Sequence, residues 1–328
     1  MISIIIPTLN RCDLLKKTID SILKHNKNYE LYELIVIDNG SSDATKNIFE
    51  DIKHENKDAK MNYFFDDIPG LLTGRHRGVK ESKGEILTFI DDDVEVSETW
   101  LNAINEIMIK RPEVSLLTGP CLPNYEINPP DWLQHFWTND TNGKHCGWLS
   151  LMDFGLEEKE IDPLFVWGLN FTIRKSVFED LKGFHPDSMP KKLQFYQGDG
   201  ETGLSIKAKE SGNMAFYSPK ISLLHFVPKS RLSIEYLYER SYFQGVADGY
   251  TEIRRSNGLY FNQNKKISIK KKLKRFIKKR ILNFKSNENI PFGKKIQDKY
   301  NEGKNFIRKN YLSNEEVKSW ILKINYLE

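Results

Sequence analysis

Short apolar runs alternate with amphipathic segments over the first hundred residues, and this alternation restricts the fold more than any other feature of the sequence. Strands that alternate with helices predict βαβ units and a mostly parallel sheet flanked by helices. Right-handed crossovers bring the carboxyl ends of such strands to one edge, where ligands bind in open α/β sheets. We therefore expect an α/β, Rossmann-like fold with a site at that edge. The expected strands are 2–6, 33–38, 61–65 and 85–91, and the expected helices are 13–25, 43–55 and 73–82.

The pattern changes twice further along the chain. Strand-like segments lie at 114–119 and 166–174, and helices are expected from about Ser176 and Thr202. The intervening stretch 120–163 is rich in Pro, Asn, Trp and Gly, which predicts a long surface excursion that lines a binding site. Beyond His225 the pattern is helical, so we expect one domain over 1–230 and a helical C-terminal region over 231–328. The helical segments expected there are 233–255, 268–284, 293–309 and 313–325.

The composition excludes several classes of protein. With 39% hydrophobic residues and 19 Phe among 328 residues, the chain is expected to fold. Its three cysteines show no C-x-x-C spacing, which argues against a disulfide framework or a cysteine zinc site and favours a cytoplasmic location. The short apolar run before Pro7 predicts a strand and not a signal peptide, and no stretch approaches the roughly 20 apolar residues that cross a bilayer.

A strongly basic segment lies near the C-terminus. Residues 265–285 carry eleven Lys or Arg and no acid, although the rest of the chain has 38 basic against 45 acidic residues. The pattern predicts a basic amphipathic helix, which either docks peripherally on the anionic inner face of the plasma membrane or packs on the protein with a solvated basic face. Nucleic-acid binding is not expected, because aromatic residues are not interleaved with the cations. The apolar stripe consists of Ile269, Leu273, Phe276, Ile277, Ile281 and Phe284.

Three consecutive acids, Asp91, Asp92 and Asp93, follow the fourth apolar run. Like charges repel, so each carboxylate must be solvated or paired with a cation. Mn²⁺ or Mg²⁺ prefers carboxylate oxygens and bridges to substrate phosphates, which suits two acids on one face of a strand, as expected for Asp91 and Asp93. The sequence thus predicts a divalent-metal site, and a solvated acidic turn is the alternative.

Four motifs follow one another in the N-terminal part: IIIPTLNR at 4–11, LIVIDNGSSD at 34–43, PGLLTGRHRG at 69–78 and GEILTFIDDDV at 84–94. In order and spacing they resemble the bacterial-type family 2 glycosyltransferases of the GT-A fold, and the resemblance covers about 1–250. It implies an inverting enzyme that binds a nucleoside-diphosphate sugar, a UDP- or dTDP-sugar, with a divalent metal.

The resemblance also implies where this donor binds. Asp38 would contact the base or ribose, the loop 7–11 would cradle the nucleoside, Asp91 would face the ribose or sugar, and Asp93 would hold the metal on the diphosphate. A diphosphate also needs N–H groups or basic side chains, which the loop and helix start near Gly70 supply; a surface salt bridge is the alternative for Arg75. The expected donor-binding residues are Pro7, Thr8, Asn10, Arg11, Asp38, Asn39, Gly70, Arg75, Asp91 and Asp92.

Acids also precede the helix expected from Thr202. An inverting transfer needs a carboxylate that takes the proton from the acceptor hydroxyl. The resembled family usually has two adjacent acids at this helix start, of which the second is the base. Here Gly200 takes the place of the first acid, and Asp199 lies one residue upstream. We expect Glu201 to be the base, with Asp199 as the alternative; the simpler interpretation of Glu201 is a favourable interaction with the helix dipole.

Two further features depend on the resemblance. His225 ends an apolar strand and, as in many members of that family, would complete the metal or diphosphate site, with Arg231 near a phosphate oxygen; a core histidine is the alternative. Trp167, Gly168 and Asn170 resemble the stretch that shapes the sugar and acceptor pocket, and strand core is the alternative there.

The expected function is therefore transfer of a sugar to a saccharide or lipid-linked saccharide acceptor, in the synthesis of cell-surface polysaccharide or another glycan. Two alternatives share the same fold: a nucleotide-sugar-binding protein without transferase activity, and a nucleotidyltransferase. The second lacks support in the sequence, because no glycine-rich, lysine-bearing phosphate loop follows the first strand. A lipid or nucleic-acid binder built on 265–285 is a further alternative.

Overall fold

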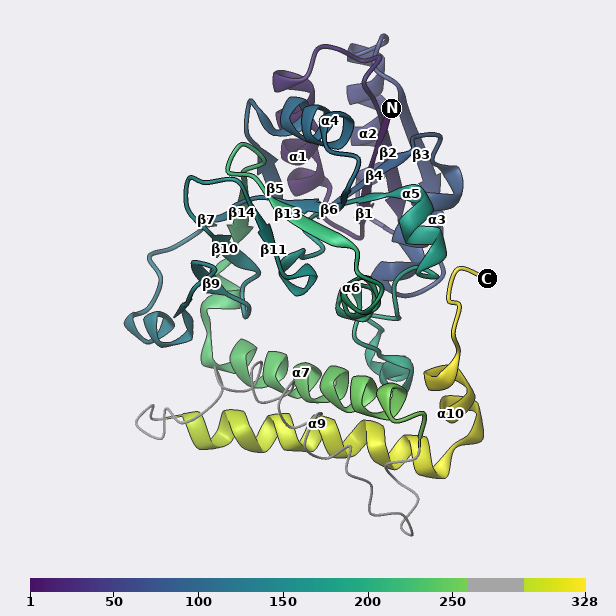
Figure 1. The fold of residues 1–328 in the computed structure, drawn as a ribbon, viewed down its shortest axis with the longest axis vertical. Helices are drawn as coiled ribbons and strands as arrows, with labels where there is room; N and C mark the ends of the chain where they lie inside the picture. The colour runs from purple at the N-terminus through teal and green to yellow at the C-terminus, as the bar shows by residue number, and fades with distance from the viewer. Residues whose placement is uncertain (259–291) are drawn as a thin grey trace.

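A mixed eight-stranded sheet forms the centre of the computed structural model, which describes residues 1–258 and 292–328 (Figure 1). From one edge to the other, its strands are β11 (Lys159–Ile161), β13 (Met214–Tyr217), β6 (Val114–Thr118), β12 (Asn170–Arg174), β4 (Ile86–Ile90), β1 (Ile2–Thr8), β2 (Tyr32–Asp38) and β3 (Met61–Phe65). The strands β4, β1, β2 and β3 are parallel, whereas β12 runs antiparallel to both of its neighbours. The predicted α/β fold and its four N-terminal strands are confirmed.

Apolar burial explains the central strands, because every residue of β1 and β2 is buried. Helices cover the sheet, and α3 packs so closely on β1 that a Cβ at Gly78 would overlap the side chain of Ile5. Thr8 pairs in register with Asp38, so the carboxyl ends of β1 and β2 lie together. The helices before residue 230 are α1 (Cys12–His25), α2 (Thr45–Glu55), α3 (Leu71–Glu81), α4 (Trp100–Lys110), α5 (Lys175–Asp180) and α6 (Glu201–Glu210), with short 3₁₀ helices at Asp131–Phe136, Pro163–Phe165, Lys191–Tyr196 and Lys229–Leu232.

The segment 120–163, where a surface excursion was expected, instead contributes strands to a second, six-stranded sheet. Its strands, in order, are β5 (Val94–Val96), β14 (Leu223–Val227), β7 (Cys121–Tyr125), β10 (Leu151–Asp153), β9 (Lys144–Cys146) and β8 (Thr138–Asn139). Leu133 and Leu151 are buried there against Val227 and Leu232, in a small core of its own. These strands are too short for period-two alternation to show in the sequence, so the pattern suggested loops. The helix α4 was likewise not expected.

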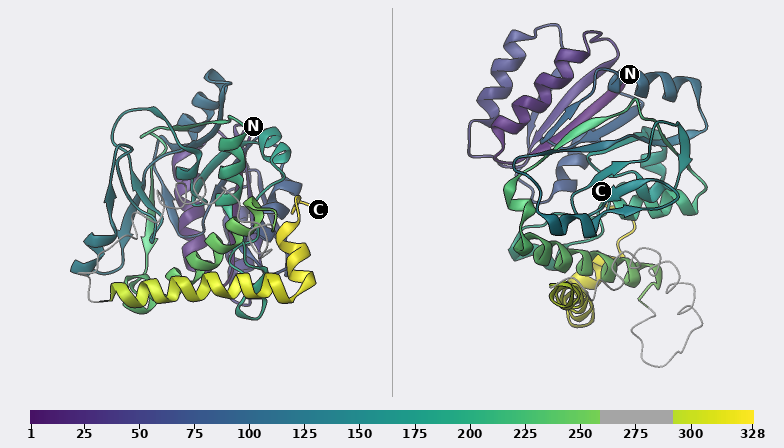
Figure 2. Two further views of the ribbon diagram at one scale, coloured as in Figure 1. Left: turned by 60° about the horizontal axis from the view of Figure 1, so that its bottom comes forward. Right: turned by 90° about the vertical axis from the view of Figure 1, so that its left-hand side faces the viewer.

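Helices α7 (Ile234–Arg255), α9 (Gly293–Ser313) and α10 (Glu315–Leu322) form the C-terminal region, as the periodicity of 233–255, 293–309 and 313–325 predicted. Figure 2 shows α7 and α9 side by side beneath the α/β part. Lys304 and Arg308 of α9 both bind Glu252 of α7, at 2.5 and 2.6 Å. The expected basic helix at 265–285 lies outside the described residues. Among those that are described, none of the helices combines the length and apolar character needed to cross a bilayer.

The C-terminal end of the chain folds back onto the α/β part through His76 of α3. Nε2 of His76 accepts a hydrogen bond from the Phe184 N–H at 3.0 Å, and Nδ1 lies 3.1 Å from the carbonyl oxygen of Tyr326. A nitrogen that accepts is unprotonated, so Nδ1 carries the hydrogen and donates it to Tyr326. The neutral imidazole thus joins α3, the segment before α6 and the C-terminal end.

This contact predicts acid-sensitive stability. Burial lowers the pKa of His76 from its ordinary 6.5 to about 4. Between these values the unfolded chain binds the proton and the folded protein does not, so the free energy of unfolding falls as the pH falls through this window, by up to about 3 kcal/mol. We expect His76→Gln to remove this part of the pH dependence in urea unfolding between pH 7 and 4. His54→Gln, at an exposed site on α2, is the control and should leave it unchanged; equal slopes for wild type and His76→Gln would contradict the assignment.

Candidate active site

The loops that follow β1 and β2 are joined by polar contacts. The Asn39 N–H donates to the Thr8 carbonyl at 2.9 Å, and Asn10 Oδ1 accepts from the Ser42 N–H at 2.8 Å. Asp38 is buried, and its carboxylate accepts hydrogen bonds from the N–H groups of Gly40 and Ser41 and from Tyr63. Asp38 therefore shapes the loop after β2, at the sheet edge where the sequence places the donor.

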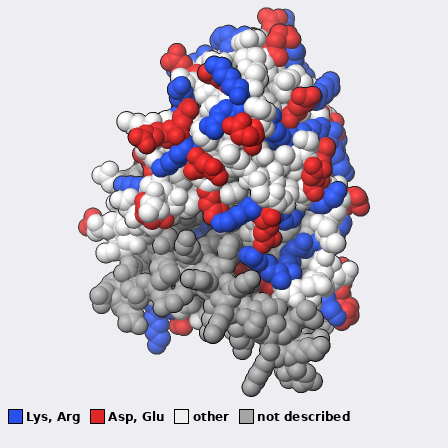
Figure 3. All heavy atoms as spheres, viewed as in Figure 1, with Lys and Arg blue, Asp and Glu red and all other residues white. Residues whose placement is uncertain are grey.

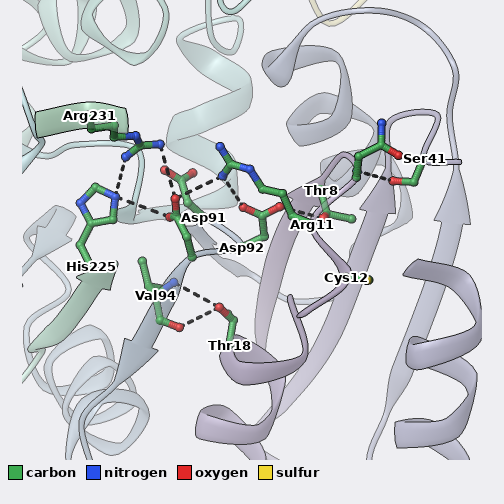
Figure 4. A network of polar contacts seen from close by, with 12 residues as sticks. Thr8, Arg11, Cys12, Thr18, Ser41, Asp91, Asp92, Val94, His225 and Arg231 are labelled. Atoms are coloured by element: carbon green, nitrogen blue, oxygen red, sulfur yellow. Dashed lines mark hydrogen bonds and ion pairs between the residues drawn. The ribbon is translucent and has the colours of Figure 1, made fainter. Parts of the chain in front are cut away.

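Asp91, Asp92 and Asp93 lie in the turn between β4 and β5, because β4 ends at Ile90. The expectation that Asp91 and Asp93 share one strand face is therefore wrong. Asp92 and Asp93 instead share Arg11, whose Nη1 lies 2.9 and 3.2 Å from their carboxylates, and Asp92 also accepts from Thr8 Oγ1 at 2.7 Å. Figure 4 shows Arg11 and Thr8 approaching the acids from the β1 side and His225 and Arg231 from the β14 side.

Burial and charge act in opposite directions on these two acids. Burial raises the pKa of Asp92 to about 6, and the Arg11 charge opposes this rise. For Asp93, burial is outweighed by the contacts with His225, Arg231 and Arg11, which hold its pKa below the ordinary value. Asp93 is thus the more stably ionised of the two.

Asp93 and His225 face each other across the turn. Nε2 of His225 lies 3.6 Å from Asp93 Oδ1 and 2.9 Å from Arg231 Nη1, and Arg231 Nη2 lies 3.4 Å from Asp93 Oδ2. A guanidinium only donates, so its hydrogen bond to His225 requires a lone pair on Nε2. Asp93 Oδ1 is buried and has no hydrogen-bond partner among residues 1–258 and 292–328. In this tautomer of His225, two acceptors face each other across a short gap.

This gap fits a divalent cation. Carboxylate oxygen and imidazole nitrogen are both ligands of Mn²⁺, and a buried acceptor without a partner is costly. In the described part of the chain, no group of three or more His, Cys, Asp or Glu side chains is arranged to hold a metal by itself. A cation bound together with a diphosphate needs only one or two protein ligands, since phosphate oxygens and water supply the rest.

Arg75 of α3 connects the acid turn with the helix start of α6. Its side chain is 1% exposed, and Nη2 donates to Asp91 Oδ1 at 2.8 Å and to the Gly168 carbonyl at 3.0 Å. Its Nη1 lies 3.8 Å from Glu201 Oε2. The surface salt bridge considered as the alternative for Arg75 is excluded by this burial. Asp91 and Glu201 therefore lie on either side of one buried cation.

The two candidate bases differ in accessibility. The side chain of Glu201, at the first position of α6, is 26% exposed and accepts from the Gly168 N–H at 3.4 Å. The side chain of Asp199 is 3% exposed, with Oδ1 2.7 Å from His185 Nδ1 and Oδ2 accepting from Thr251 Oγ1 at 2.5 Å. Burial opposes ionisation of Asp199, but His185 and Thr251 outweigh it and lower its pKa. Both oxygens of Asp199 are thus engaged, which favours Glu201.

A cavity of about 800 Å³ opens beside Glu201, between the second sheet and α7. Trp167, which the sequence assigned to an acceptor pocket, lines this cavity, and Gly168 lies next to it through its contacts with Arg75 and Glu201. Asn170 does not line the cavity: it is fully buried, and its side chain binds Trp100 and the Ile221 carbonyl, which is the strand-core alternative.

Several residues at this site were not found from the sequence. Asp187, Gln197, Arg240, Phe243 and Tyr300 line the cavity with Glu201. They come from the segment before α6 and from α7 and α9, and no motif marks them. Among the expected donor residues, Gly70 is the N-cap of α3 next to Met189 and Asp187, and Asn39 packs against Gly74 of the same helix.

Comparisons with known proteins agree with this fold. The model of the family "Glycosyl transferase family 2" matches residues 3–182. A GalNAc(5)-diNAcBac-PP-undecaprenol beta-1,3-glucosyltransferase of Campylobacter jejuni is 34% identical over 130 residues, which cover 39% of this chain and 40% of that protein. Validoxylamine A glucosyltransferase of Streptomyces hygroscopicus is 22% identical over 206 residues, which cover 57% and 47%. The chain thus spans less than half the length of these relatives.

Solved structures show the same fold at low identity. Mannosyltransferase PcManGT from Pyrobaculum calidifontis, in complex with GDP-Man and Mn²⁺, has a TM-score of 0.56 and 16% identity, over 99% of this chain and 84% of that one. GalNAc-T7 with UDP, GalNAc and Mn²⁺ has a TM-score of 0.54 and 18% identity, over 84% and 54%. These likenesses show the fold of the GT-A glycosyltransferases. Because the family model matches more than half of its residues, this chain belongs to glycosyl transferase family 2.

Proposed function

We propose that this chain transfers a sugar, with inversion, from a nucleoside-diphosphate sugar to an acceptor hydroxyl, with a divalent cation at the diphosphate. One observation carries the proposal: the buried Arg75 joins the acid turn at Asp91 to Glu201, which opens into the cavity. A donor at the sheet edge would then have its sugar between the turn and Glu201. The nucleoside would lie against the loops after β1 and β2.

Charge neutralisation is the task on the donor side. Asp93 and His225 would hold a Mn²⁺ or Mg²⁺ ion, which when bound stabilises the charge of a leaving diphosphate. Arg11 and Arg231 already lie at this turn, and each would offer a charge-assisted hydrogen bond to a phosphate oxygen. Asp92, held by Thr8 and Arg11, would keep Arg11 in place.

Proton transfer is the task on the acceptor side. In a single displacement, the acceptor oxygen attacks the anomeric carbon while the bond to the diphosphate breaks. Glu201 would take the acceptor proton, because its carboxylate is accessible at the cavity whereas both oxygens of Asp199 are engaged, and Arg75 and the Gly168 N–H would fix its position. Trp167 would contribute an aromatic wall for the acceptor sugar.

A lipid-linked saccharide is the acceptor class that we propose, since the name of the Campylobacter relative specifies an undecaprenol-linked glycan. We also propose that 265–285 docks the chain on an anionic membrane surface, where such an acceptor is found. A UDP- or dTDP-sugar is the proposed donor, and cell-surface glycan synthesis is the proposed role. We also propose that a boundary near 230 separates the catalytic domain from the helical region. Figure 3 shows acidic and basic side chains intermixed over the described part of one face.

A panel of nucleotide sugars, scored by release of nucleoside diphosphate with and without Mn²⁺, tests the proposal. We expect one nucleotide class to be turned over with Mn²⁺ and to lose at least about 100-fold in rate with EDTA, because the leaving diphosphate then loses its counter-charge. Donor binding without release, over a broad set of acceptors, would favour a binding protein. Pyrophosphate release from a nucleoside triphosphate would favour a nucleotidyltransferase.

A further inference from the structure

The segment before α6 brings a carboxylate to the place where an adjacent acid is missing. The sequence has Gly200 where the resembled family usually has the first of two adjacent acids, and the structure explains why. A Cβ built on Gly200 would lie 2.7 Å from Oδ2 and 3.1 Å from Cγ of Asp187. The backbone of Gly200 also has φ +61°, a conformation that L side chains rarely adopt. Glycine thus leaves room for the Asp187 carboxylate beside Glu201.

Asp187 is held in this position by defined contacts. Its Oδ1 accepts hydrogen bonds from Gln197 Nε2 at 2.6 Å and from the Ser188 N–H at 2.7 Å. Gln197 is itself buried, and its Oε1 accepts from the Met189 N–H at 2.9 Å. Both bonds to Asp187 end on Oδ1, and in the described residues no hydrogen bond to Oδ2 is seen. Oδ2 is therefore the oxygen left for a ligand.

The surroundings of Asp187 point to a ligand in the cavity. Asp187, Gln197, Glu201 and Arg240 line the same cavity of about 800 Å³. Burial and the Glu201 charge raise the pKa of Asp187 to about 6, and the Arg240 charge opposes this rise. Several acids line the cavity, and among them Asp187 and Glu201 lie close enough for the Glu201 charge to act on Asp187. Such a pair suits a ligand with two neighbouring hydroxyl donors, because each carboxylate then accepts one hydrogen bond.

We infer that Asp187 is a second acceptor-binding residue, whose Oδ2 accepts a hydrogen bond from the acceptor hydroxyl next to the one that Glu201 deprotonates. The inference rests on the proposed function and narrows the proposed saccharide acceptor to one that presents two neighbouring hydroxyls at the cavity. The aromatic side chains of Trp148, Trp167 and Phe243 on the cavity lining suit the apolar face of such a sugar.

The test compares Asp187→Asn with wild type in two reactions of one donor. Methyl and p-nitrophenyl glycosides are the acceptors in the first, and water is the acceptor in the second, which is donor hydrolysis. Asparagine keeps the size of the side chain and a partner for Ser188 or Gln197. We expect kcat/KM for the glycoside to fall about 10- to 100-fold, mainly through KM, while hydrolysis stays within about twofold. Asp187→Ala should show the same split more strongly.

Glycoside binding gives a readout that needs no turnover. The fluorescence of Trp148 and Trp167 should change as methyl glycosides bind, and the Kd should rise at least about tenfold in Asp187→Asn. The control is Glu179→Gln, which makes the same acid-to-amide change at an exposed position on α5 and should leave both readouts unchanged. Equal glycoside Kd in wild type and Asp187→Asn would overturn the inference. A wild-type protein that binds glycosides but turns over no donor would overturn the proposed transfer and leave the binding result standing.

Discussion

Asp93→Asn is expected to lower donor turnover by at least about 1,000-fold. The substitution removes the carboxylate charge that we propose holds the metal ion at the leaving diphosphate. Asp93 is surrounded by Arg11, Arg231 and His225, and its Oδ1 is the buried oxygen that has no partner in the described part of the chain. An amide has the same shape but carries no charge and is a weak ligand of Mn²⁺. The measurement is nucleoside diphosphate release over a series of Mn²⁺ concentrations.

The metal dependence distinguishes a lost ligand from a damaged fold. We expect the activation by Mn²⁺ seen in wild type to be absent or strongly weakened in Asp93→Asn, with an unchanged circular dichroism spectrum. Glu95→Gln is the matched control, since Glu95 is an exposed acid on β5 two positions away. Wild-type turnover with wild-type Mn²⁺ dependence in Asp93→Asn would contradict the assignment of Asp93 to the metal.

Glu201→Gln is expected to reduce sugar transfer about 100- to 10,000-fold while donor affinity changes less than about twofold. Glutamine still contacts the Gly168 N–H, so the helix start is kept, but it cannot take a proton from the acceptor. The donor site lies on the other side of Arg75 and should be little affected. Transfer is measured at saturating donor, and donor affinity is measured separately by calorimetry with the intact nucleotide sugar.

Asp199→Asn provides the comparison between the two candidate bases. Asp199 binds His185 and Thr251 with both oxygens, so its replacement should lower the melting temperature and leave kcat within about fivefold of wild type. A larger loss of kcat in Asp199→Asn than in Glu201→Gln, with donor affinity intact in both variants, would reverse the assignment.

The N-terminal half of the fold follows from local sequence patterns. Continuous apolar runs such as 33–38 become strands buried on both faces, and the helices between them show three- and four-residue spacing. The second sheet could not be predicted in this way. Its strand β10 has only three residues, and its core forms between Leu151 and Val227, which lie far apart in the sequence.

The candidate site, like the fold, could be predicted only in part from local sequence patterns. The acids 91–93 and Glu201 were found because they follow strands or precede a helix in a recognisable order. The side chains that Asp91, Asp92 and Asp93 contact were not predicted, because β4 ends at Ile90 and the following turn sets the directions of the three carboxylates. Arg75 was expected to bind the donor, with a surface salt bridge as the alternative, whereas the fold buries it between Asp91 and Glu201.

By itself, the sequence determined the α/β class, the sheet edge where the site lies and the acids at that edge, because these depend on periodicity and on residues close together in the chain. The tertiary structure alone decided which partners those acids have. Asp187 shows the difference: it lies 14 residues before Glu201, and only the folding of the intervening segment, with Gly200 free of a side chain, brings the two carboxylates to one cavity. Contacts of this kind depend on packing between distant segments, which no local pattern encodes.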